Sequence, residues 1–125
     1  MMTQKDDQLK LLAKAFNELV VERDWDKFHS PKNLAMNLMN EASELSEFFT
    51  WISEEKSKES PPAEMKEKIS EEVGDVFLTL VSFCAQLDID IFQAAFDKLE
   101  KIKKKYPVAQ FKGRDTKYSV HIAEA

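Results

Sequence analysis

Residues 38–49 read LMNEASELSEFF and residues 69–80 read ISEEVGDVFLTL, and these two stretches decide the fold. Each places two acids three positions apart, with an apolar residue three positions before the first acid and another directly after the second. A helix turns by about 100° per residue, so this spacing puts the acids beside the apolar face of each helix. If the helices pack as an antiparallel hairpin, we expect four carboxylates to converge near the edge of the core: Glu41, Glu44, Glu72 and Asp75.

The rest of the chain also favours helices over strands. Its 125 residues include only 2 Gly and 4 Pro, and 43% are apolar against 33% charged, which is typical of one helical domain with a core. Apolar periodicity predicts four helices, over about 4–23, 31–53, 63–87 and 90–106. We therefore expect an all-α four-helix bundle.

The predicted helix ends carry ordinary start and stop signals. Ser30 and Pro31 combine an N-cap residue with a proline at the first helical position, and Asp88 or Asp90 is expected to cap the last helix. The polar stretch 54–62, which contains two prolines, predicts a loop. Residues 1–107 are expected to form the helical domain and residues 108–125 an extended or partly disordered C-terminal arm.

Composition disfavours several classes of function. The net charge of −5, with no long basic block before residue 101, argues against binding a nucleic acid. The longest apolar stretch, residues 76–85, is too short to span a bilayer, so no membrane segment is expected. The single cysteine, Cys84, permits no intramolecular disulfide, and we expect it to be buried. A cytoplasmic location is therefore expected.

Glycine and histidine positions exclude further site types. The only glycines are Gly74 and Gly113, which leaves no glycine-rich phosphate loop. Gly74 inside a helix costs about 1 kcal/mol relative to alanine, and close helix packing beside the acids would justify it. A di-iron bundle needs histidines three residues after glutamates, and neither His29 nor His121 has that spacing.

Four clustered acids point to a bound cation. They repel one another and lose hydration unless they are protonated or neutralised. Carboxylate oxygens suit Mg²⁺, with Mn²⁺ also possible, and Mg²⁺ commonly shares substrate phosphates. The alternative is that these acids are simply solvated on their helices. Glu47 extends the first pair and is expected to be a further ligand, a base or an exposed residue.

At these acids the sequence resembles the MazG-like, all-α nucleoside triphosphate pyrophosphohydrolases, whose motif is Glu-x-x-Glu, a spacer, then Glu-x-x-Asp. It is most similar to the dCTP pyrophosphatase branch, over roughly residues 9–119. The segments that carry the resemblance are Arg23-Asp24-Trp25, Phe28-His29, Pro31 with Asn33-Leu34, residues 41–51, residues 71–76, Lys105-Tyr106-Pro107 and Lys117-Tyr118.

The resemblance implies a magnesium-dependent attack of water on the α-phosphorus of a nucleoside triphosphate. dCTP or a modified dCTP would yield the monophosphate and pyrophosphate, as nucleotide-pool housecleaning. The four acids would be both metal ligands and catalytic residues, and a carboxylate near Glu44 would take the proton. Residues 1–107 would be the catalytic domain. Members of the family form homodimers or homotetramers, in which some of the large apolar residues Met36, Met39, Phe48 and Phe49 would lie between subunits.

By position, Trp25, His29 and Trp51 resemble residues that line the base and sugar pocket of this branch, where a base would stack on aromatic rings. Lys98 and Tyr106 match phosphate-side positions. For the tryptophans core packing stays an alternative, and for His29 a surface or capping role.

Two residues depart from the dCTP pyrophosphatase pattern. Thr79 stands where tyrosine is common and Ile102 where asparagine is usual, which puts the base and sugar preference in question. Two other readings stay open. One is the same chemistry on another canonical or damaged nucleotide, and the other is a non-catalytic helical module for nucleotide binding or oligomerisation.

Overall fold

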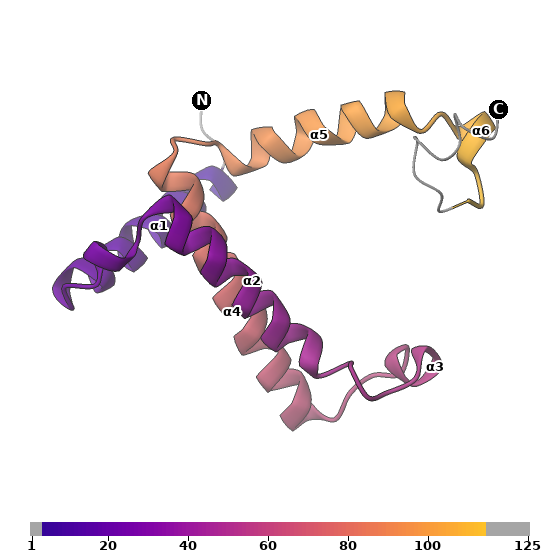
Figure 1. Cartoon of the computed structure of the whole chain (residues 1–125), viewed down its shortest axis with the longest axis horizontal. Helices are drawn as coiled ribbons and strands as arrows, with labels where there is room; N and C mark the ends of the chain where they lie inside the picture. Colours follow the sequence, from indigo (N-terminus) through magenta and orange to yellow (C-terminus); the bar gives the residue numbers. More distant parts are fainter. Residues whose placement is uncertain (1–3, 115–125) are drawn as a thin grey trace. The chain divides into compact units, whose positions relative to one another are not determined.

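The computed structural model describes residues 4–114, and every regular element in that range is helical (Figure 1). The all-α prediction is confirmed. Lys117, Tyr118 and His121 lie outside the described residues. The helices are α1 (Gln4–Glu22), the short 3-10 helix η1 (Asp26–Phe28), α2 (Pro31–Glu47), α3 (Glu54–Ser57), α4 (Ala63–Gln86), α5 (Ile91–Lys105) and α6 (Val108–Phe111).

The centre of the first unit, residues 1–89, is a hairpin of α2 and α4 that lie side by side (Figure 1). α2 starts as predicted, because the Ser30 hydroxyl accepts a hydrogen bond from the Asn33 backbone N–H at 3.2 Å and Pro31 follows. α1 packs against α4. The buried apolar residues of this unit are Val20, Leu34, Val81 and Cys84, which confirms that Cys84 is buried.

The end of α2 differs from the prediction, since the helix stops at Glu47 and not near residue 53. The Phe49 N–H bonds to the Ser46 carbonyl, an i to i+3 contact that tightens the last turn. The Thr50 hydroxyl bonds to the same carbonyl at 3.1 Å and replaces the bond that a continuing helix would need.

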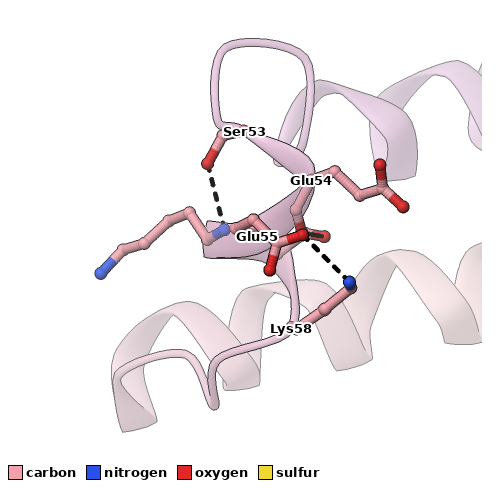
Figure 2. Close-up of polar contacts among 6 residues, drawn as sticks. Ser53, Glu54, Glu55 and Lys58 are labelled. Carbon is pink, nitrogen blue, oxygen red and sulfur yellow. Dashed lines mark hydrogen bonds and ion pairs between the residues drawn. The ribbon is translucent and has the colours of Figure 1, made fainter.

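The predicted loop between α2 and α4 contains one helical turn, α3. The Ser53 hydroxyl accepts the Lys56 N–H at 3.1 Å, and the Lys58 ammonium lies 3.2 Å from the Glu55 carboxylate (Figure 2). Glu54 and Glu55 occupy the first turn, where acids interact favourably with the helix dipole. The polar composition suggested a loop, but a good N-cap followed by acids is a local helix start.

The second unit, residues 90–125, contains α5 and α6. Asp90, and not Asp88, caps α5: its carboxylate accepts the Gln93 N–H at 3.0 Å. The Tyr106 ring then meets Phe111 of α6 edge-on, with ring centroids 4.9 Å apart. Residues 108–111 form α6, so the start of the predicted extended arm is helical.

The first unit leaves large apolar side chains exposed on both helices of its hairpin. Met39 on α2 is 61% exposed and Val73 on α4 is 51% exposed. A Cβ added at Gly74 would meet no atom within 4 Å, so the expected close packing at Gly74 is absent within the described chain. None of the described helices is long and apolar enough to cross a membrane.

Candidate functional site

The α2–α4 hairpin brings the four predicted acids together. Each of Glu41, Glu44, Glu72 and Asp75 offers a carboxylate oxygen, and these oxygens all lie within 4.8 Å of one another. Two residues come from each helix, and in each pair they are three positions apart, so both carboxylates of a helix face its partner. The geometric part of the sequence prediction is therefore observed.

Two of these carboxylates are in an environment that disfavours their charge. One oxygen of Glu41 and one of Glu72, both Oε2, are buried without a hydrogen-bond partner. Burial raises the pKa of Glu41, and the charges of Glu44 and Asp75 raise it further. Burial also raises the pKa of Glu72, and the nearby charges of Glu44 and Asp75 raise it further. A buried acceptor without a donor costs free energy, which a cation would offset.

The cluster has the size and chemistry of a site for a hard divalent cation. Oxygens on opposite sides of one Ca²⁺ lie up to about 5 Å apart, and those on opposite sides of one Mg²⁺ about 4 Å apart. The four oxygens lie within 4.8 Å of one another, so Mg²⁺ would draw them slightly closer together. Glu44 and Asp75 are exposed while Glu41 and Glu72 are partly buried, so a bound ion would have protein on one side and solvent on the other.

Beside the acids is an open depression of about 440 Å³, lined by Glu44, Glu47, Phe48 and Glu72. Glu47 is thus close to the quartet and exposed to solvent. Of the three roles that the sequence left open for Glu47, this position is compatible with each.

A second depression, of about 370 Å³, lies at the start of α2. His29, a predicted substrate residue, is part of its wall and also ends η1 through its backbone N–H. Asn37 and Asn40 line the same depression and were not among the site residues predicted from the sequence. Their spacing was a usable signal, because residues 37, 40 and 44 fall on one face of a helix.

The two tryptophans are not core residues within the chain. Trp25 is 47% exposed, and the Arg23 guanidinium lies 5.7 Å from its ring centroid. Trp51 is 92% exposed in the segment after α2. Trp25 and His29 precede α2 and Trp51 follows it, so the two groups lie beyond opposite ends of a 17-residue helix, about 26 Å long.

Thr79 and the predicted phosphate-side residues are placed as follows. Thr79 is buried, and its hydroxyl donates to the Asp75 carbonyl at 2.9 Å, so its one donor is used within α4. Lys98 is an exposed residue of α5, and Ile102 is 41% exposed. Tyr106 is the C-cap of α5, where its N–H bonds to the Ile102 carbonyl. The roles of Lys98 and Tyr106 remain predictions.

Known proteins are similar to this chain in sequence and in fold. Residues 29–109 match the MazG nucleotide pyrophosphohydrolase domain. dCTP pyrophosphatase 1 of Mus musculus is 36% identical over 103 residues, and that of Homo sapiens is 31% identical over 103 residues. Each alignment covers 82% of this chain, which spans only 61% of the length of these relatives.

A solved structure supports the same relationship. The crystal structure of a pyrophosphatase from Archaeoglobus fulgidus superposes with a TM-score of 0.72 at 31% sequence identity, and it covers 86% of this chain and 95% of its own. The matched family segment contains all four clustered acids. The chain therefore belongs to the family of MazG nucleotide pyrophosphohydrolase domains.

Proposed function

We propose that this protein is a magnesium-dependent nucleoside triphosphate pyrophosphohydrolase, and that dCTP or a modified dCTP is its substrate. The observation that carries this proposal is the cluster of four carboxylates on α2 and α4, which lies within the matched family segment. The dCTP preference rests on the relatives named dCTP pyrophosphatase 1. Hydrolysis would yield the monophosphate and pyrophosphate.

In this proposal the quartet holds Mg²⁺ through the oxygens of Glu41, Glu44, Glu72 and Asp75. Bound Mg²⁺ would neutralise charge on the phosphates and lower the pKa of the attacking water. Glu41 and Glu72 are partly buried, which limits the positions that their carboxylates can take as ligands. Glu47, exposed at the rim of the same depression, is positioned to accept the proton that the water loses.

The proposed base pocket requires a second copy of the chain. Trp25 and His29 lie beyond one end of α2 and Trp51 beyond the other, too far apart to enclose one base within a single chain. Two copies whose α2 helices run antiparallel would place Trp51 of one near His29 of the other. The exposed apolar residues of the hairpin, such as Met39, suit such a homodimer, or a homotetramer built from two of them.

The test is release of pyrophosphate from each dNTP and NTP, with and without Mg²⁺, with identification of the nucleotide product. Glu41→Gln and Asp75→Asn should each lower kcat by about a hundredfold or more, because each removes a charged metal ligand without changing its size. Glu67→Gln is the matched control, since Glu67 is an exposed glutamate of α4 outside the quartet.

Two results would redirect the proposal. Turnover that prefers another base would keep the reaction and reject dCTP. Tight triphosphate binding without Mg²⁺-dependent hydrolysis would reject the enzyme in favour of a nucleotide-binding module.

A further inference from the structure

Two depressions of the first unit, the one at the start of α2 and the one beside the acids, follow one another along the same face of α2. The first is lined by Asn33, Asn37 and Asn40, and the second by Glu44 and Glu47. At 100° per residue these five positions fall within about 80° of one another around the helix axis. Amide side chains therefore occupy the first turns of this face and carboxylates the last turns.

The three amides differ in what they already bind. The Asn33 amide donates to the Phe28 carbonyl at 3.1 Å, which ties η1 to α2. The side-chain amides of Asn37 and Asn40 are exposed and make no hydrogen bond to the part of the chain that the structure describes. Each can both donate and accept, as required for pairing with a base edge or a sugar hydroxyl.

The spacing matches the order of parts in a nucleotide. Asn40 lies one turn before Glu44, about 6 Å along the axis, and Asn37 lies two turns before it, about 10 Å away. In a nucleoside triphosphate the sugar adjoins the α-phosphate and the base follows the sugar. With the phosphates at the acid quartet, a nucleotide that runs toward the start of α2 brings its sugar past Asn40 and its base past Asn37.

The walls of the first depression suit a base as well. Phe28 and Met36 contribute exposed apolar surface, at 58% and 54% exposure, next to the amides. An aromatic ring and a polarisable thioether can cover the flat face of a base while amides pair with its edge. A volume of about 370 Å³ is within the range of small-ligand sites.

We propose that Asn37 and Asn40 are specificity-determining residues that hydrogen-bond the nucleoside, Asn40 at the sugar and Asn37 at the base edge. This inference rests on the proposed function, because the acid quartet sets the position of the phosphates. It adds two residues that read the nucleoside and are not part of the metal site.

The first experiment measures binding and needs no turnover. Calorimetry with Mg²⁺ compares inorganic triphosphate with a dCTP analogue whose α–β bridging oxygen is replaced by NH. The wild-type protein should bind the nucleotide more tightly than triphosphate. Asn37→Ala and Asn40→Ala should each weaken nucleotide binding about tenfold and leave triphosphate binding unchanged. Ser43→Ala is the control on the same helix, since Ser43 lines neither depression.

The second experiment assigns the two amides by turnover ratios. Asn37→Asp replaces a donor and acceptor by an acceptor alone, so it should raise the ratio of dCTP to dUTP turnover, because cytosine presents an amino group where uracil presents a carbonyl. Asn40→Ala should change the ratio of dCTP to CTP turnover and leave the base ratio unchanged. Both substrates of a pair carry the same charge, so general repulsion cancels.

The outcomes separate this inference from the proposed function. Nucleotide binding that is unchanged in both alanine variants, or a wild-type protein that binds the nucleotide no better than triphosphate, overturns the role of the amides. If nucleotide binding depends on the amides but no hydrolysis occurs, the proposed role of Asn37 and Asn40 is supported and the enzyme activity is rejected.

Discussion

Glu41 and Glu72 each keep one buried oxygen without a donor, and both have a raised pKa because of burial and neighbouring acids. In the metal-free protein, the free energy of unfolding should therefore fall as the pH rises from 4.5, the ordinary value for these groups, through their raised pKa values. The sign follows because the folded state holds protons that the unfolded state has already released in that window.

Bound Mg²⁺ should offset most of this fall in the free energy of unfolding. We expect it to raise the midpoint of thermal unfolding more at pH 8 than at pH 5, because ionised carboxylates bind the cation. The double variant Glu41→Gln, Glu72→Gln should show a flatter pH dependence and little response to Mg²⁺, measured by calorimetry. An equal Mg²⁺ effect at both pH values would mean that the cation binds elsewhere.

At the scale of one helix, Gly74 is the informative position of α4. It lies between Val73 and Asp75 in the helix interior, and an added Cβ would meet no atom within 4 Å. Gly74→Ala should therefore stabilise the protein by about 1 kcal/mol through helix propensity alone, as measured by urea unfolding. If the variant is instead less stable, a second copy packs closely against this turn.

At the scale of the whole molecule, mixing two single-residue variants tests whether the proposed base pocket is shared between two copies of the chain. His29→Ala and Trp51→Ala should each reduce turnover strongly when assayed alone, because each removes one wall of the pocket. Hybrid dimers of the two variants contain one site with both native side chains. A one-to-one mixture, refolded together, should regain about a quarter of the wild-type activity.

The mixing test also has a clear negative result. If the mixture is no more active than its components while hybrids form, both residues act within one chain or Trp51 does not contact the substrate. Two separate samples of the same variant, mixed and refolded together in the same way, provide the control for refolding.

Three features follow from residue order and spacing: the helical class, the start of α2 at Ser30 and Pro31, and the convergence of four acids. These features depend on local periodicity and capping, which neighbouring residues set. The end of α2 and the single turn of α3 were not predicted, although they also depend on local contacts within residues 48–57. There the hydroxyls of Thr50 and Ser53 bond to backbone groups, and periodicity alone does not show where one helix ends and the next begins.

Helix packing sets which side chains of the hairpin are buried and which groups lie next to the acids. Val73 of α4 is exposed, and Thr79 of the same helix is buried with its hydroxyl donor already used. Burial depends on which helix packs against which, and periodicity gives the apolar face but not its partner. The spacing of Asn37 and Asn40 places them on one helix face with Glu44, but it does not show that they line a depression. That depression forms only because η1 lies against α2.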